Sequence, residues 1–133
     1  MASDEKDAAE TSVLVVEDDF DLRDALVPIL EYEGHRVVSA ANGREALDRL
    51  QATPLPSLIL LDLMMPVMNG EAFRAAQLRD PRLAAIPVVV VSAHPAAEDQ
   101  AARMGAVACV RKPFDVDDLL AAVRRGSARL RRP

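Results

Sequence analysis

The sequence predicts an α/β domain in which five parallel strands form one sheet that helices cover on both faces. Five short apolar runs alternate along the chain with stretches of helical periodicity. Three of these runs are continuously apolar, which is typical of strands buried on both faces of a parallel sheet. At 133 residues, half of them apolar, the chain is long enough to bury one compact core.

The expected strands are the five apolar runs, each of strand length. They cover residues 13–16, 37–40, 58–61, 88–91 and 107–110. Alternating strands and helices form right-handed crossovers, and ligands of such sheets bind beyond the carboxyl ends of the strands. We therefore expect the functional side chains directly after the strands.

The first expected helix has the clearest boundaries. Asp19 is a suitable N-cap, and apolar residues recur at helical spacing from Leu22 to Leu30 before Gly34 ends the helix. Pro28 lies inside this pattern, where it removes one backbone hydrogen bond and favours a kink. The later helices are expected over residues 44–50, 71–78 and 96–104, and from residue 116 onward.

One domain with two short ends is the expected organisation. Residues 1–11 are polar and acid-rich and predict a disordered tail, so the domain covers residues 12–126. Residues 127–133 form a basic end that either extends the last helix, as far as Leu130, or is a solvated tail. We prefer a solvated end to a phosphate-binding one, because basic side chains suit the negative end of a helix dipole.

Composition excludes several classes of protein. The 21 acidic residues outnumber the 16 basic ones, for a net charge of −5, so we expect no direct contact with nucleic acid. The single cysteine, Cys109, cannot form an internal disulfide and favours the cytoplasm. The chain start lacks the apolar stretch of a signal peptide, and no apolar run approaches the roughly 20 residues that cross a bilayer, so we expect no membrane association.

Polar side chains follow four of the five expected strands. Glu17 and Asp18 follow the first, Asp62 the third, Ser92 the fourth and Lys112 the fifth. An acidic cluster by itself is more often a solvated turn. Four strand ends that deliver carboxylates, a hydroxyl and an ammonium to one sheet edge rarely coincide by chance, so we predict a functional site there.

The residue types at this edge suit phosphoryl transfer. Neighbouring carboxylates resist ionisation unless a cation relieves their repulsion, and Mg²⁺ or Mn²⁺ binds such oxygen ligands while keeping positions open for phosphate. Asp62 can attack phosphorus as a carboxylate nucleophile and form an acyl phosphate. Lys112 would neutralise one phosphoryl oxygen, and Ser92 would donate a hydrogen bond to another.

The motifs at these strand ends resemble the receiver domains of bacterial two-component response regulators over residues 12–125. The matching stretches are VLVVEDD, LILLDLMMPVMNG, VVVVSAH and CVRKPF. The resemblance implies a CheY-like, flavodoxin-like (βα)₅ fold, doubly wound, with strand order 2-1-3-4-5. It also implies a phosphoacceptor that catalyses only its own phosphorylation and dephosphorylation, rather than an enzyme with a separate substrate.

The resemblance assigns a role to each residue of the predicted site. Glu17 and Asp18 match the metal-binding acid pair, and Asp62 matches the phosphorylation site, which is also a metal ligand. The backbone carbonyl of Met64 would be a further metal ligand.

Ser92 and Lys112 match the phosphoryl-binding and switch residues of that family. The Lys112–Pro113 peptide bond would be cis, which is reasonable because only X-Pro bonds adopt that isomer at low cost.

Two features depart from the family pattern. Cys109 occupies the position of the aromatic residue that usually moves on phosphorylation, and we interpret it as a small packed hydrophobe rather than a redox switch. The shape change is then either muted or carried by another element, such as the loop at residues 92–95. Met64 and His94 flank the expected path of the hydrolytic water, and apolar Met64 predicts a long phosphorylated lifetime. His94 either acts on that water or is a surface histidine without a role.

The resemblance implies protein partners. These are a sensor histidine kinase or phosphotransfer protein as donor and a downstream effector protein or domain, which would bind the face formed by the fourth helix, fifth strand and fifth helix. Homodimerisation through this face is equally open.

Three other readings of the sequence compete with this one. A haloacid-dehalogenase phosphatase would need a second Asp where Met64 stands, and a nucleotide-binding enzyme would need a glycine-rich loop that follows none of the strands. A pseudo-receiver, which docks partners without phosphorylation, is the main alternative.

Overall fold

The computed structural model describes residues 11–52 and 54–131, the last three of them by backbone alone. Strands and helices alternate along the described chain. They are β1 (Ser12–Val16), α2 (Phe20–Tyr32), β2 (Arg36–Ala40), α3 (Gly43–Ala52), β3 (Leu58–Leu61), α4 (Gly70–Arg79), β4 (Val88–Ser92), α5 (Ala97–Arg103), β5 (Ala108–Arg111) and α6 (Val116–Arg131).

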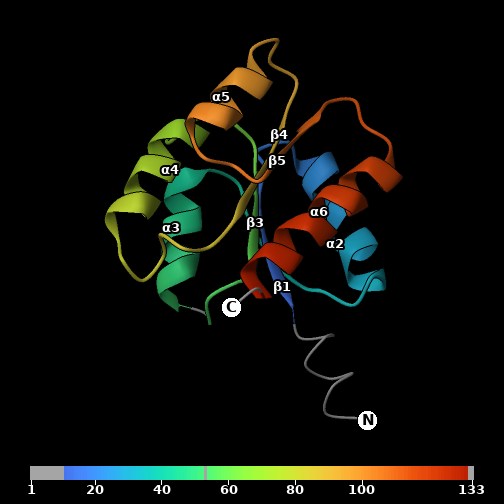
Figure 1. Cartoon of the computed structure of the whole chain (residues 1–133), viewed down its shortest axis with the longest axis horizontal. Coiled ribbons are helices and arrows are strands. Elements are labelled where there is room, and N and C mark those ends of the chain that lie inside the picture. Colours follow the sequence, from blue (N-terminus) through green and yellow to red (C-terminus); the bar gives the residue numbers. More distant parts are fainter. Residues whose placement is uncertain (1–10, 53, 132–133) are drawn as a thin grey trace.

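All five strands are parallel and lie in one sheet of order β2-β1-β3-β4-β5. The helices cover both faces, with α3, α4 and α5 on one side and α2 and α6 on the other (Figure 1). This confirms the predicted fold class and strand order. Because every strand runs the same way, all five carboxyl ends reach one edge of the sheet, which we call the carboxyl edge, and the opposite edge is the amino edge.

Two apolar clusters fill the space between the sheet and its helices. Alternate residues of a strand point to opposite faces, so the continuous apolar runs supply both clusters at once. Every residue of β3 and of β4 is buried. One cluster joins the sheet to α3, α4 and α5 and includes Phe73, and the other joins it to α2 and α6 and includes Leu30 and Leu119. Burying apolar side chains on both faces fixes the sheet as a rigid platform for its carboxyl edge.

The boundaries of α2 follow from its capping residues. Asp19 is the N-cap, and its carboxylate accepts a hydrogen bond of 3.1 Å from the Leu22 amide, as predicted. The helix ends before Gly34, which adopts a φ of +95° that favours glycine. Pro28 lies within the helix.

The structure describes part of each predicted end. Thr11, which we assigned to the tail, is buried, and its carbonyl accepts a hydrogen bond of 2.9 Å from the Arg36 amide beside β1. At the other end α6 continues through Gly126 to Arg131. Residues 1–10 and 132–133 lie outside the described residues. The side chains of Arg129 and Arg131 also lie outside them. Within the described ranges, no helix combines the length and apolarity needed to cross a bilayer.

Candidate functional site

Three carboxylates meet at the carboxyl edge of the sheet. The adjacent strands β1 and β3 place them there: the Asp62 amide donates to the Val16 carbonyl, and the Glu17 amide donates to the Ala40 carbonyl, each at 3.0 Å. Carboxylate oxygens of Glu17, Asp18 and Asp62 all lie within 4.8 Å of one another. Glu17 and Asp62 are only 2 % and 5 % exposed, while Asp18 faces solvent. The site thus combines two buried acids with one at its rim.

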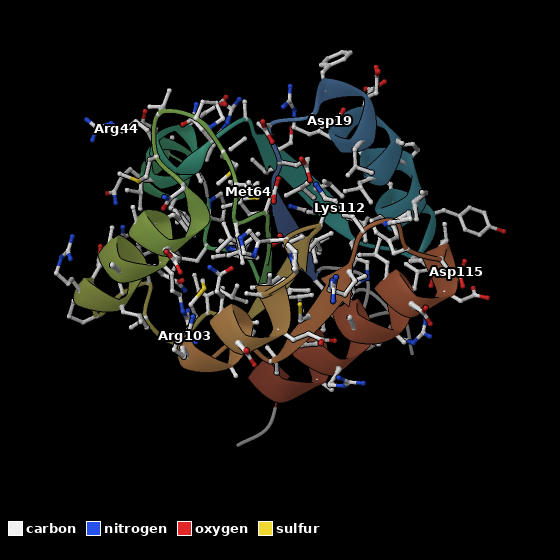
Figure 2. The ribbon with its side chains drawn as sticks, turned by 90° about the horizontal axis from the view of Figure 1, so that it is seen from above. Asp19, Arg44, Met64, Arg103, Lys112 and Asp115 are labelled. Carbon is white, nitrogen blue, oxygen red and sulfur yellow. The ribbon has the colours of Figure 1, made fainter. Side chains whose placement is uncertain are left out.

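Lys112 lies across the two buried acids. Its Nζ is 2.7 Å from Glu17 Oε1 and 3.3 Å from Asp62 Oδ2. The Lys112 amide donates to the Ser92 carbonyl at 3.0 Å, which continues the β4–β5 pairing to the carboxyl edge. Figure 2 views this edge and shows Lys112 and Met64 near its centre, between the helices of the two faces. One ammonium thus pairs with two of the three carboxylates, and the acids at the site outnumber it.

The pKa of Glu17 departs from its ordinary value. It is raised from 4.5 to about 7, mainly by burial and also by the charge of Asp62, against the opposing effect of the hydrogen bond from Lys112. A cation bound beside Glu17 would favour its deprotonated form and so lower this pKa. The Glu17 carboxylate is therefore set up to bind a cation.

The surroundings of Lys112 favour its charged form. Burial alone would lower the pKa of Lys112, but the hydrogen bond to Glu17 and the charges of Asp62 and Glu17 outweigh burial, so its pKa is raised. The ammonium therefore stays charged at neutral pH and is held by its acidic partners at a position beside Asp62.

Ser92 lies at the same edge, but its side chain is hydrogen-bonded to a backbone amide rather than to the acids. It is fully buried at the end of β4, and its Oγ accepts a hydrogen bond of 3.1 Å from the His94 amide. His94 Nδ1 in turn accepts a hydrogen bond of 3.0 Å from the Ala96 amide, just before α5. His94 and Met64 both line a groove of about 550 Å³ beside the acids. The two residues expected to flank the hydrolytic water thus share one groove.

The loop after Asp62 is tightly constrained. The Met64 amide donates to Asp62 Oδ1 at 3.2 Å, which orients the carboxylate, while the Met64 side chain is 60 % exposed. A Cβ atom at Gly70 would lie 2.5 Å from the Asp62 carbonyl oxygen, so only glycine allows α4 to start this close to Asp62. Val67 has a φ of +69°, a strained value for a β-branched residue.

Arg23 is a site neighbour that the sequence did not reveal. Its Nη1 donates a hydrogen bond of 2.7 Å to the Glu17 carbonyl, and its guanidinium lies 5.5 Å from the Phe20 ring centroid. The Asp19 amide also donates to Glu17 Oε2 at 3.1 Å. The spacing of Arg23 one turn after the Asp19 N-cap was the available signal, because that turn begins directly beside the acids.

Cys109 lies within β5, and the Lys112–Pro113 bond follows the end of that strand. Cys109 is half-buried and packs against the apolar cluster under α3, α4 and α5. Burial raises the pKa of its thiol, and Glu98 adds to this effect, so the thiol stays protonated and unreactive. The Lys112–Pro113 peptide bond is cis.

The donor set fits a hard divalent cation. Carboxylate oxygens are the preferred ligands of Mg²⁺, and a site with few protein ligands suits its tendency to keep waters and phosphate oxygens. The pKa of Glu17 is raised mainly by burial and also by the charge of Asp62, and a bound cation would oppose both effects. Glu17, Asp18 and Asp62 can thus hold such an ion, with Lys112 beside it.

Comparison with known proteins gives one consistent family. A family model for the response regulator receiver domain matches residues 13–124. The chain is 38% identical over 125 residues to response regulator Rre1 of Synechocystis sp., which covers 92% of this chain and 54% of Rre1. It is 31% identical over 116 residues to sporulation initiation phosphotransferase F of Bacillus subtilis, covering 85% of this chain and 90% of that protein. The chain spans about half the length of Rre1 and of other curated relatives it matches.

Solved structures agree with the sequence comparison. The structure of the chemotaxis protein CheY4 of Vibrio cholerae aligns with a TM-score of 0.79 and 29% identity, covering 88% of this chain and 98% of CheY4. The family model extends from within β1 to within α6, so it includes every strand end that carries a site residue. This chain belongs to the family of receiver domains of two-component response regulators, whose function is regulated by phosphorylation.

Proposed function

We propose that Asp62 is the phosphoacceptor of this receiver domain and takes a phosphoryl group from a histidine kinase or phosphotransfer protein. The observation that carries the proposal is the meeting of three carboxylates within 4.8 Å, with Lys112 Nζ 3.3 Å from Asp62. The cluster has more acidic than basic side chains. The proposal explains that excess as a site for Mg²⁺ or Mn²⁺.

The chemistry requires only positioning by the chain. An Asp62 carboxylate oxygen attacks phosphorus, the bond from phosphorus to the donor imidazole nitrogen breaks, and that nitrogen keeps the electron pair. Lys112 stabilises charge on a phosphoryl oxygen, and the Ser92 hydroxyl turns to donate to another once its contact with the His94 amide loosens. A bound Mg²⁺ supplies positive charge that offsets the charge developing on the transferred group. Glu17, Asp18, Asp62 and the Met64 carbonyl would hold it.

Phosphorylation by acetyl phosphate tests the proposal. We expect wild-type protein with Mg²⁺ to gain one phosphoryl group by intact mass, while Asp62→Asn with Mg²⁺ and wild type without a divalent cation gain none. Asp48→Asn on the exposed side of α3 is the matched control and should be phosphorylated like wild type. Equal labelling of wild type and Asp62→Asn would contradict the assignment. No labelling of either protein would favour the pseudo-receiver, which uses the fold only as a docking surface.

Met64 sets the lifetime of the phosphorylated state in this proposal. Its side chain is 60 % exposed and lines the groove beside Asp62, where an apolar side chain cannot orient an attacking water. Met64→Asn would add a hydrogen-bonding group worth about 1 kcal/mol, so we expect dephosphorylation to accelerate about fivefold. The decay of phosphoprotein after removal of acetyl phosphate measures this. A slower decay in Met64→Asn than in wild type would contradict it.

His94 is a second candidate for contact with the hydrolytic water. Its Nδ1 already accepts from the Ala96 amide, so only Nε2 remains to face the groove. If His94 acts on the water, His94→Gln should slow decay in wild type and also in Met64→Asn. An unchanged decay rate in both backgrounds assigns His94 to the start of α5 alone.

The output surface in this proposal is the face formed by α5, β5 and α6. β5 is an edge strand of the sheet, and a groove of about 450 Å³ between it and α6 is lined by Cys109, Arg111, Phe114, Asp118 and Arg125 among others. We propose that an effector protein or domain, or a second copy of the chain, binds there. The net charge of −5 favours protein rather than nucleic acid or membrane as the partner.

The remaining parts of the proposal concern the whole protein. Residues 12–126 form the receiver unit, and the chain catalyses only its own phosphorylation and dephosphorylation. We expect it in the cytoplasm, where the free thiol of Cys109 would stay reduced.

A further inference from the structure

A second polar cluster is buried at the amino edge of the sheet. Arg74 of α4 is 8 % exposed and Gln77, one turn later, is fully buried. Arg74 Nε donates to the Met104 carbonyl at 3.0 Å, and its Nη2 lies 3.5 Å from the Gly105 carbonyl. Both carbonyls belong to the turn between α5 and β5. This cluster lies outside the phosphorylation site and has no part in its chemistry.

Arg74 contacts only neutral groups, one on its own helix and two on a distant turn. Its Nη1 donates to Gln77 Oε1 at 2.8 Å, and Gln77 Nε2 donates to the Leu83 and Ile86 carbonyls at 2.9 and 3.0 Å. Among the described residues, no carboxylate lies within ion-pair distance of Arg74. The planar guanidinium thus fastens α4 to a turn that is 30 residues away in the sequence.

The opposite end of α4 touches the phosphoacceptor. Gly70 begins the helix, its amide donates to the Leu63 carbonyl at 3.0 Å, and its Cα is too close to Asp62 for any side chain. Arg74 follows Gly70 by one helical turn and therefore lies on the same face of α4. A displacement of the Asp62 backbone consequently moves Gly70 and Arg74 together.

We propose that Arg74 couples the state of Asp62 to the start of β5, through the rigid first turns of α4 and the Met104 and Gly105 carbonyls. This inference rests on the proposed function and names how the site is read out. It places Arg74 as a positioning residue that reaches the α5–β5–α6 face from the amino edge. Such a route suits a chain in which Cys109 stands where an aromatic side chain usually moves.

The geometry at the receiving end makes the coupling measurable. The Val107 amide donates to the Val88 carbonyl at 2.8 Å and starts the β4–β5 pairing, and the Ala106 amide donates to the Ala101 carbonyl at 3.0 Å. The Ala106 amide directly follows the Gly105 carbonyl that Arg74 contacts, and the Val107 amide is the next one along the chain. A shift of that turn alters these hydrogen bonds and hence the exchange rates of both amide protons.

The test is hydrogen exchange with and without beryllofluoride and Mg²⁺, which stand in for the phosphoryl group. In wild type we expect exchange to change around residues 62–66 and also at Ala106 and Val107. In Arg74→Met the change at 62–66 should persist, while that at Ala106 and Val107 should shrink at least threefold. Arg74→Lys, which keeps the charge but not the planar fork, should give an intermediate loss.

Two controls separate coupling from general loosening. Arg79→Met removes an exposed arginine of the same helix, and Val123→Ala weakens the core under α6 without touching Arg74. Both should keep the wild-type response at Ala106 and Val107. The inference is overturned if Arg74→Met keeps the wild-type change in exchange at Ala106 and Val107, or if Val123→Ala loses as much of that change as Arg74→Met does. It is also overturned if wild type shows a change at residues 62–66 but none at Ala106 and Val107. A wild type without any response at 62–66 would instead overturn the proposed function.

Discussion

The two buried polar clusters of this chain, one at each edge of the sheet, are built on opposite principles. At the amino edge, Gln77 is fully buried and both ends of its amide are hydrogen-bonded, while Arg74 is surrounded by carbonyl groups. At the carboxyl edge, three carboxylates lie together, Lys112 pairs with two of them, and Glu17 has a pKa raised to about 7. In the first cluster the polar groups are hydrogen-bonded to one another and to backbone carbonyls, whereas in the second the acids outnumber the basic groups.

The difference teaches how to recognise a functional cluster in a fold of this kind. A buried polar group whose hydrogen bonds are all made adds to stability, whereas excess buried charge costs stability unless something binds to it. Removing a polar group should therefore destabilise the amino edge, while removing a charge at the carboxyl edge should stabilise the protein without a cation. The two edges should therefore respond to substitution with opposite signs.

The largest expected effect is at Gln77. Gln77→Met keeps the length of the side chain but leaves the Ile86 carbonyl and Arg74 Nη1 without their partner, and the Leu83 carbonyl loses one of its two hydrogen bonds. We expect the free energy of unfolding to fall by about 3 kcal/mol, since each buried unsatisfied group costs roughly 1 kcal/mol or more. Urea unfolding at pH 7 measures the change.

Gln51→Met is the matched control for this substitution, because Gln51 lies on α3 with its side chain exposed. It should leave the free energy of unfolding nearly unchanged. A loss in Gln77→Met no larger than that in Gln51→Met would show that the amino-edge cluster contributes nothing to stability, and the contrast between the edges would disappear.

The second prediction concerns Glu17 and has the opposite sign. Because its folded pKa of about 7 lies above the ordinary value of 4.5, the folded protein holds a proton there that the unfolded chain releases. The stability linked to this proton is fully present below pH 4.5 and is lost as the pH rises through 7. At pH 8 without a divalent cation, Glu17→Gln should therefore be more stable than wild type by about 2 kcal/mol.

Magnesium should reverse this order. Its binding requires the deprotonated carboxylate, so wild type should gain more stability from Mg²⁺ than Glu17→Gln does, and the gain should grow as the pH rises from 6 to 8. Thermal unfolding with and without Mg²⁺ at several pH values measures both effects. Glu31→Gln, on the exposed side of α2, is the control and should behave as wild type. An unchanged or lower stability of Glu17→Gln at pH 8 would refute the unbalanced-charge account.

Sequence reasoning found the fold and the carboxyl-edge residues for the same physical reason. Continuous apolar runs mark buried parallel strands, and parallel strands bring their carboxyl ends to one edge, so Glu17, Asp62 and Lys112 could be placed together before any coordinates. Each of these residues lies within one position of a strand end, where topology alone fixes its location.

The amino-edge cluster could not be found this way. Arg74 and Gln77 lie in the middle of a helix, and their partners are backbone carbonyls of turns, which leave no residue-type signal in the sequence. Arg23 likewise contacts a backbone group, the Glu17 carbonyl, so only its spacing from Asp19 pointed to the site. Contacts to backbone groups depend on packing distances between elements, and packing distances are not encoded by the periodicity of apolar residues.

The smallest expected effect tests whether the carboxyl edge also stores backbone strain. Val67 has a φ of +69°, and the Met68 amide donates to the Pro66 carbonyl at 2.7 Å, which is the strained form of a γ-turn. The Val67 side chain is 82 % exposed, so its removal loses little burial. Val67→Gly should relieve a positive-φ cost of about 1 to 2 kcal/mol and add about 0.5 to 1 kcal/mol of unfolded-chain entropy, for a net gain of about 0.5 to 1 kcal/mol. Val67→Ala keeps a Cβ atom, so urea unfolding should place it between wild type and Val67→Gly. A Val67→Gly protein less stable than wild type would show that this loop is relaxed, and that charge alone distinguishes the two edges.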